Sequence, residues 1–144
     1  ELIDGVDVLV NTIPAGTFHP IRVAGTVKAG YNGLAFEDFA GYEYADVRHP
    51  EEYVYFRVEG DSMAPAINDG DLALVRLQND VDSGQVAVVV VNGEEGTIKK
   101  IIKRSGSIVL QPFNPDYETR VFHGPEADEV HIAGLVVETK RKWI

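Results

Sequence analysis

Three things are scarce in this sequence: cysteine, positive charge and long apolar runs. The 144 residues include no cysteine, which excludes disulfide bonds and thiolate chemistry but says little about the cellular compartment. Lysine and arginine number 13 against 23 acidic residues, so the net charge is -10. This charge repels phosphate backbones, and we expect no direct nucleic-acid binding by this segment. No apolar run approaches the ~20 residues of a membrane helix and no signal-peptide pattern is present, so we expect a soluble, cytoplasmic domain.

The residues that are present suffice for one folded domain, since 44% of them are hydrophobic. Because the chain begins at Glu1 rather than methionine, we expect it to be part of a longer protein. Residues 1–20 show no sustained period, which predicts an interdomain linker or arm. Residues 21–50 carry glycines among aromatic residues and are expected to form short strands, turns and a mobile loop. Residues 51–144 are the expected core.

From residue 53 onward, β-branched or aromatic runs alternate with turn signals. A valine run followed by Asn92-Gly93 predicts a hairpin, although the loop is longer than two residues. Short strands at this spacing indicate a mainly β fold, a sandwich or a barrel-like sheet. The runs expected to be strands are 53–58, 72–77, 85–91, 97–102, 108–111, 120–122 and 130–139.

Ser62 and Lys99 are the candidate catalytic pair. Ser62 follows a glycine-led turn in Gly60-Asp61-Ser62-Met63, and Lys99 lies 37 positions later in a β-branched run. A serine hydroxyl is a poor nucleophile until a neighbouring base accepts its proton, and a lysine can be that base only when its amine is neutral. Burial in an apolar pocket lowers the pKa of a lysine, because the charged form loses hydration. The pattern therefore suggests a serine/lysine dyad.

The residue pattern alone leaves alternatives open. Strand alternation puts Thr97, Lys99 and Ile101 on one face, while Lys100 shares the other face with two isoleucines that should pack on the core. The Thr97 hydroxyl could then hold the Lys99 amine in a cleft, but periodicity does not choose between the two lysines. A basic edge strand for the lysines and a turn or cap role for Ser62 are also compatible with the pattern, and composition and spacing alone favour them over the dyad. The four histidines have no motif context and are expected to be surface or structural residues: His19, His49, His123 and His131.

Several motifs, in order, resemble those of the LexA-type self-cleaving repressors and the related UmuD proteins. Residues 60–72 (GDSMAPAINDGDL) are similar to the serine signature of that family, and residues 97–101 (TIKKI) to its lysine segment. Residues 84–89 and 132–137 resemble two of its strands, and residues 23–30 (VAGTVKAG) its cleavage-site region. The implied fold is a LexA/UmuD-type β-rich catalytic and dimerisation domain of short antiparallel strands.

The resemblance assigns roles to the residues of the two motifs. Ser62 is the implied nucleophile, and Lys99, the first lysine of its pair, is the implied general base. Thr97 is implied to support the lysine amine. Backbone N–H groups around Asp61 and Ser62 are implied to form an oxyanion hole, and Met63 is a further supporting residue of the motif. No cofactor and no metal are implied.

The implied substrate lies in the chain itself. Ala29 and Gly30 form the implied scissile pair, with Val27 and Lys28 as the preceding substrate segment. Ala29 is small enough for a tight pocket, and Gly30 allows a loop to bend sharply into a cleft. Lys28 departs from the small apolar residues that also occur at its position in the family.

The resemblance also implies partners. These are a second copy of the chain in a homodimer formed partly through the C-terminal strand, and the RecA filament on single-stranded DNA as activator of cleavage. Operator DNA would be bound only through an N-terminal helix-turn-helix domain that this chain lacks. Two alternatives remain: a phage-type repressor dimerisation module that is not cleaved and responds to an antirepressor, and a UmuD-like polymerase accessory subunit. Signal peptidases carry a related serine motif, but the missing membrane anchor argues against them.

Overall fold

The computed structural model describes residues 18–30 and 33–141, and the fold is mainly β, as predicted. The strands are β1 (Phe18–Ala24), β2 (Thr26–Gly30), β3 (Gly33–Glu37), β4 (Tyr42–Asp46), β5 (Tyr53–Arg57), β6 (Leu72–Leu77), β7 (Val86–Val91), β8 (Thr97–Arg104), β9 (Ser107–Gln111), β10 (Arg120–His123) and β11 (Val130–Lys140). Two short 3₁₀ helices, η3 (Pro50–Glu52) and η4 (Gly124–Glu129), precede β5 and β11. Among the described residues, no helix is long and apolar enough to cross a membrane.

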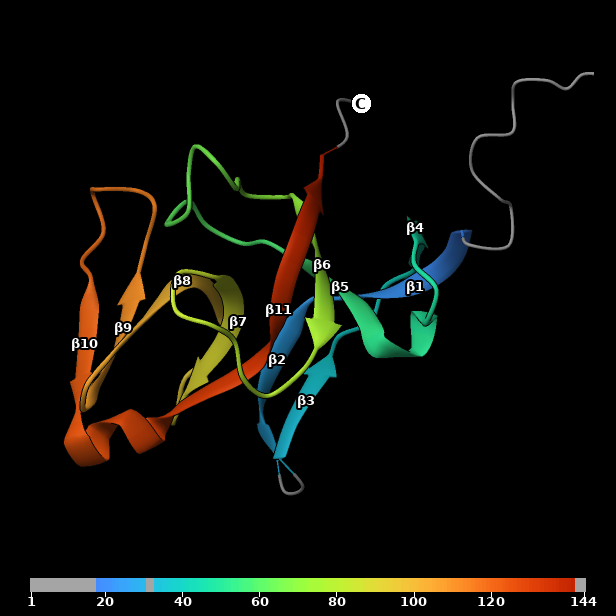
Figure 1. Ribbon diagram of the computed structural model, residues 1–144. Coiled ribbons are helices and arrows are strands. Elements are labelled where there is room, and N and C mark those ends of the chain that lie inside the picture. The colour runs from blue at the N-terminus through green and yellow to red at the C-terminus, as the bar shows by residue number, and fades with distance from the viewer. Residues whose placement is uncertain (1–17, 31–32, 142–144) are drawn as a thin grey trace, which may run out of the picture.

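The strands form two sheets of very different size. The larger sheet has nine strands in the order β10-β9-β8-β7-β11-β6-β5-β1-β4. The long strand β11 crosses its middle, with β7 to β10 on one side and β6, β5 and β1 on the other (Figure 1). The smaller sheet is the hairpin β2–β3, which projects from the larger sheet in the same view.

All seven strands expected from residue 53 onward are present, with bounds that differ by at most two residues. Their pairings are antiparallel, as expected, and β7 and β8 form the predicted hairpin. One pair departs from this rule, because β1 and β5 are parallel. Parallel neighbours need a long connection, and β2, β3 and β4 supply it. Strand β1 begins at Phe18, inside the segment expected to be an arm, and residues 1–17 lie outside the described part of the chain.

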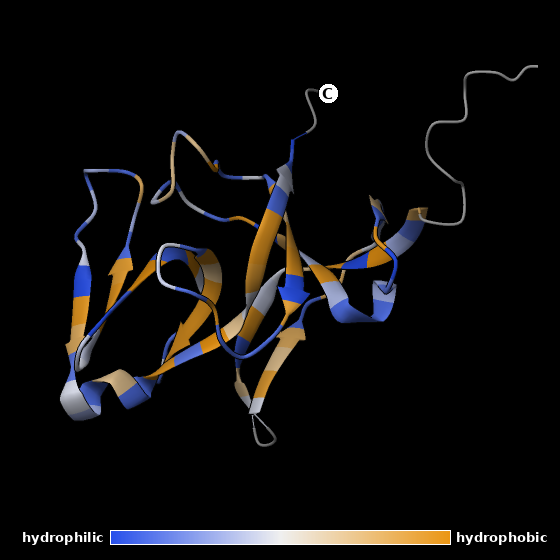
Figure 2. Ribbon diagram, in the orientation of Figure 1, coloured by the Kyte–Doolittle hydropathy of each residue, from blue (hydrophilic) through white to orange (hydrophobic). Residues whose placement is uncertain are grey.

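The apolar side chains form three clusters on the two faces of the large sheet. The first cluster contains Val88, Val90 and Ile98, and the third contains Val89 and Ile101. Successive valines of β7 therefore pack alternately into the first and the third cluster, as expected for a strand with both faces covered. Figure 2 shows hydrophobic residues concentrated along β6 and β7.

Candidate active site

The candidate nucleophile lies in the loop between β5 and β6, residues 58–71, called the serine loop below. The neck of this loop is closed by two hydrogen bonds, from the Val58 amide to the Asp71 carbonyl oxygen (2.9 Å) and from the Gly70 amide to the Val58 carbonyl oxygen (2.8 Å). Gly60 and Gly70 have φ of 83° and 88°, values that glycine adopts without strain. These two hydrogen bonds and two glycine turns fix the backbone of the serine loop on both sides of Ser62.

Buried side chains fix the serine turn to the core. Met63 is 3% exposed and Ile67 is 5% exposed, and both pack in the first apolar cluster. Ser62, directly before Met63, is only partly buried. Burial of Met63 and Ile67 holds the turn in place while its serine stays accessible.

Lys99 extends from β8 to the serine loop. Its Nζ lies 2.9 Å from the Ser62 Oγ, 3.0 Å from the Thr97 Oγ1 and 3.0 Å from the Ile98 carbonyl oxygen. Thr97 and Lys99 are neighbours on one face of β8, which explains why the threonine hydroxyl can reach the amine. The three residues that the sequence assigns to the dyad and its support therefore meet at one nitrogen.

The Lys99 amine can form hydrogen bonds with all three oxygens whether it is neutral or charged. A neutral amine has two N–H groups and one lone pair, whereas an ammonium has three N–H groups. The neutral form can donate to Thr97 and Ile98 and accept from the Ser62 hydroxyl. The charged form can donate to all three oxygens. A proton can thus pass from Ser62 to Lys99 without leaving a buried polar atom unpaired.

The surroundings of Lys99 favour the neutral amine. Burial lowers the pKa of Lys99 below its ordinary value, and the positive charge of Arg120 lowers it further. Arg120 lies on β10 and is itself held by Glu94, with hydrogen bonds of 2.9 and 3.0 Å. Both effects act in the direction that a general base requires.

The structure decides two questions that the sequence left open. Strand β8 lies between β7 and β9, so the interpretation of its lysines as a basic edge strand is wrong. Lys99, and not Lys100, reaches Ser62. The face that Lys100 shares with two isoleucines packs on the core as expected, since Ile98 is 3% exposed, but Ile101, on the Lys99 face, is also completely buried. The reason is that the sheet carries an apolar cluster on each side of β8.

The implied scissile pair lies in the β2–β3 hairpin and is exposed. Ala29 is opposite Leu34, and Gly30 is opposite Gly33. A small pocket of about 40 Å³ beside Ser62 is lined by the beginning of β2, and neither Ala29 nor Gly30 lines it. The structure therefore brings together Ser62, Lys99 and Thr97 but leaves the Ala29–Gly30 bond outside the pocket.

Val27 attaches this hairpin to the large sheet. Its side chain is 0% exposed in the first apolar cluster, and its carbonyl oxygen accepts a 2.7 Å hydrogen bond from the Gly96 amide. A Cβ at Gly96 would lie 2.0 Å from the Val27 Cγ1, so only glycine permits this close approach. Lys28 is exposed and 3.7 Å from Glu37. In the implied substrate segment, Val27 is therefore buried and anchors the hairpin, whereas Lys28 is exposed.

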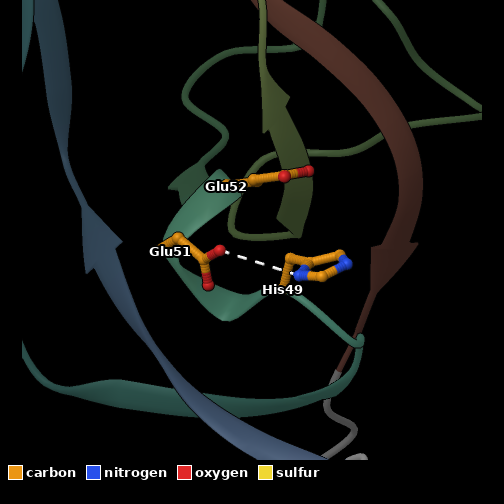
Figure 3. Close-up of side chains that lie close together, drawn as sticks. All are labelled: His49, Glu51 and Glu52. Carbon is orange, nitrogen blue, oxygen red and sulfur yellow. Dashed lines mark ion pairs between the residues drawn. The ribbon is translucent and has the colours of Figure 1, made fainter.

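The histidines lie outside this site. The His131 Nε2 lies 2.8 Å from the Asn92 Oδ1, and His123 precedes η4. Figure 3 shows His49, Glu51 and Glu52 close together around η3, with an ion pair of 3.7 Å between His49 and Glu51. These groups are largely exposed and Glu52 also pairs with Arg76, so ion pairing at the surface accounts for the cluster.

Sequence reasoning missed one contact segment, Asn114 to Tyr117. Asn114 hydrogen-bonds to the backbone of Asp61 and Ser62, and the Tyr117 hydroxyl donates to the Asp61 carboxylate. The local sequence Asn114-Pro115-Asp116 is typical of a turn, and nothing in it indicates a partner 53 positions earlier. The backbone at Asp61 and Ser62 is therefore contacted by a segment that the sequence gave no reason to expect there.

Comparison with known proteins adds the family. A family model described as Peptidase S24-like matches residues 22–137. The chain is 42% identical over 119 residues to a LexA repressor of Geobacter metallireducens, which covers 81% of this chain and 58% of that protein. It is 40% identical over 93 residues to a LexA repressor of Gluconobacter oxydans, covering 64% and 38%. The chain spans about half the length of these curated relatives. The matched residues include the serine loop, Lys99 and the β2–β3 hairpin, and the chain belongs to the S24-like peptidase family, with LexA repressors among its relatives.

Proposed function

We propose that this chain is the self-cleaving domain of a LexA-like repressor, in which Ser62 and Lys99 hydrolyse the Ala29–Gly30 bond. The observation that carries the proposal is the 2.9 Å contact between the Lys99 Nζ and the Ser62 Oγ, in surroundings that lower the lysine pKa. Similarity to LexA repressors supports the same assignment.

The proposed reaction begins with proton transfer from the Ser62 hydroxyl to the neutral Lys99 amine. The Ser62 Oγ then forms a bond to the Ala29 carbonyl carbon, and the negative charge develops on the carbonyl oxygen. Lys99 next donates the proton to the Gly30 nitrogen as the bond between Ala29 and Gly30 breaks. Water, deprotonated by Lys99, hydrolyses the resulting ester and restores the Ser62 hydroxyl.

Cleavage in this scheme requires a change in the β2–β3 hairpin. Ala29 and Gly30 are exposed and paired with β3, whereas the pocket beside Ser62 is lined by Gly25 and Thr26 of the same chain. The substrate is therefore tethered close to the nucleophile but is not engaged. Because a tethered substrate has a high effective concentration, control must act on the position of the hairpin or on the charge of Lys99.

In the whole protein, we propose that this domain dimerises and that the RecA filament on single-stranded DNA favours the engaged hairpin. A helix-turn-helix domain beyond the N-terminus of this segment would bind the operator. Cleavage would separate the two domains and weaken operator binding, because both halves of a dimer must bind together for high affinity.

Self-cleavage of the purified 144-residue chain tests the proposal. Incubation at alkaline pH should produce two fragments that mass spectrometry assigns to a break between residues 29 and 30. Ser62→Ala and Lys99→Ala should each leave the chain intact, whereas Lys100→Ala should be cleaved like the parent. Cutting of the Ser62→Ala chain at the same bond would refute the dyad. An intact parent chain, both at high pH and with RecA filaments, would favour the repressor module that is not cleaved.

A further inference from the structure

The segment between β9 and β10 contacts the serine turn at three points. The Asn114 side-chain amide donates to the Asp61 carbonyl oxygen (2.9 Å), and the Asn114 backbone amide donates to the Ser62 carbonyl oxygen (3.0 Å). The Tyr117 hydroxyl donates to the Asp61 carboxylate. Two consecutive peptide carbonyls beside the nucleophile are therefore bound by one residue, Asn114.

The hydrogen bond from the Asn114 side chain fixes the plane of the peptide between Asp61 and Ser62, which matters for catalysis. The Asp61 carbonyl and the Ser62 N–H belong to the same peptide unit, and in a trans peptide they point in opposite directions. The Asp61 carbonyl oxygen accepts a second hydrogen bond, from the Ala64 amide (3.1 Å). Two donors on one side therefore direct the Ser62 N–H to the other side.

The Ser62 N–H is also free to bind a ligand. Within residues 18–30 and 33–141, neither this N–H nor that of Asp61 donates to any protein group. Ser62 lines the small pocket that the beginning of β2 also lines. An unpaired backbone donor of fixed direction, beside the nucleophile and at a pocket, is what stabilisation of an oxyanion requires.

We propose that Asn114 is a positioning residue that holds the Asp61–Ser62 peptide plane so that the Ser62 N–H donates to the oxyanion formed at the scissile carbonyl. The inference rests on the proposed function, because it assigns Asn114 a part in that reaction. Asn114 touches neither the substrate nor the reacting atoms and acts only through the backbone of the serine turn.

The chemistry of Asn114 allows its two roles to be separated. Its Oδ1 accepts a 3.0 Å hydrogen bond from the Asp116 amide, which shapes its own turn. Its Nδ2 holds the Asp61 carbonyl. Asn114→Asp keeps an acceptor for Asp116 and loses the donor to Asp61, whereas Asn114→Ala loses both and adds no charge. A defect shared by both variants is therefore due to the lost donor.

Rates of self-cleavage as a function of pH in the 144-residue chain test this role. Loss of an oxyanion donor costs about 10²- to 10³-fold in rate, and because the N–H remains but is misdirected, we expect both variants to lose about 10- to 100-fold in the alkaline plateau. In Asn114→Ala the pH midpoint should stay at the parent value. A general disturbance of the site would instead alter the burial of Lys99 and move the midpoint.

Gln78→Glu is the matched control. Gln78 follows β6, outside the serine loop, and its Nε2 donates to a backbone carbonyl, that of Asp80, at 2.7 Å. This variant makes the same change from amide to carboxylate without touching the Asp61 carbonyl, and it should keep the parent plateau. Parent-like plateaus in Asn114→Asp and Asn114→Ala would overturn the proposal, and so would an equal loss in Gln78→Glu. In either case the dyad is still supported if Ser62→Ala is inactive, whereas cleavage by Ser62→Ala refutes the dyad itself.

Discussion

Replacement of Val27 by alanine should loosen the hairpin that carries the proposed scissile bond. The β2–β3 hairpin forms a sheet of its own, and the buried Val27 side chain attaches it to the core beside Gly96. Because the large sheet does not depend on the pairing of β2 with β3, the hairpin can undock while that sheet stays folded. Most of the stabilising free energy lost in Val27→Ala should therefore appear as more frequent undocking of the hairpin, and not as a lower stability of the large sheet.

The size of the effect follows from the complete burial of Val27. The substitution removes two methyl groups, each worth about 0.8 kcal/mol of transfer free energy. The cavity left beside Phe56 and Ile98, members of the same cluster, adds a further term, for a total of about 2–3 kcal/mol. Since 1.4 kcal/mol is a factor of ten in an equilibrium constant, undocking should become about 30- to 150-fold more frequent.

Hydrogen exchange of the Gly96 amide measures this undocking directly, because that amide donates to the Val27 carbonyl oxygen. Exchange at Gly96 should accelerate by the factor above, while the amides of β7 change much less. Gly96→Ala should also release the hairpin, since its Cβ would overlap Val27. Val121→Ala removes the same two methyl groups from a side chain that is 44% exposed, and should have little effect. Unchanged exchange at Gly96 in Val27→Ala, or equal acceleration throughout β7, would refute the anchor.

Two further substitutions test the charges around the site. Arg120→Gln removes the positive charge that lowers the Lys99 pKa and leaves Glu94 unpaired, so the midpoint of the cleavage profile should move to higher pH; a midpoint that stays or falls contradicts this. Arg141→Ala removes the guanidinium that lies 2.7 and 2.9 Å from the Asp71 carboxylate, which is 2% exposed, and should lower the free energy of unfolding. Arg141 holds the pKa of Asp71 below its ordinary value, so the pair stabilises the fold above about pH 4 and this contribution is lost as the pH falls. Denaturant unfolding at neutral and acid pH should show a difference between parent and variant that shrinks in acid, and a pH-independent difference would contradict the assignment.

The sequence predicted the strands well because each one is a local pattern. Valine and isoleucine runs bounded by turn residues specify β7, β8 and β11 without reference to the rest of the chain. The parallel pairing of β1 with β5 has no such signal, since it depends on where three intervening strands run. Burial of both faces of β8 was missed for the same reason, because alternation assumes one core and this sheet has a cluster on each side.

The site was predictable only in part. Ser62, Thr97 and Lys99 stood out because the serine and lysine motifs resemble those of a known family, and strand alternation explained the threonine. The choice between the two lysines depends on which face of β8 the serine loop approaches, a tertiary contact. Asn114 gave no sign at all, because its partners lie about 50 positions away and its local sequence specifies only a turn.

The rate of cleavage between Ala29 and Gly30 as a function of pH tests the central claim most directly. The 144-residue chain should be cut faster as the pH rises and should reach a plateau, with a midpoint below the ordinary lysine pKa of about 10.4, because burial lowers the pKa of Lys99. Ser62→Ala should show no cleavage at any pH. A rate that stays flat from neutral to strongly alkaline pH would contradict the account, as would a Ser62→Ala chain that is still cut at this bond.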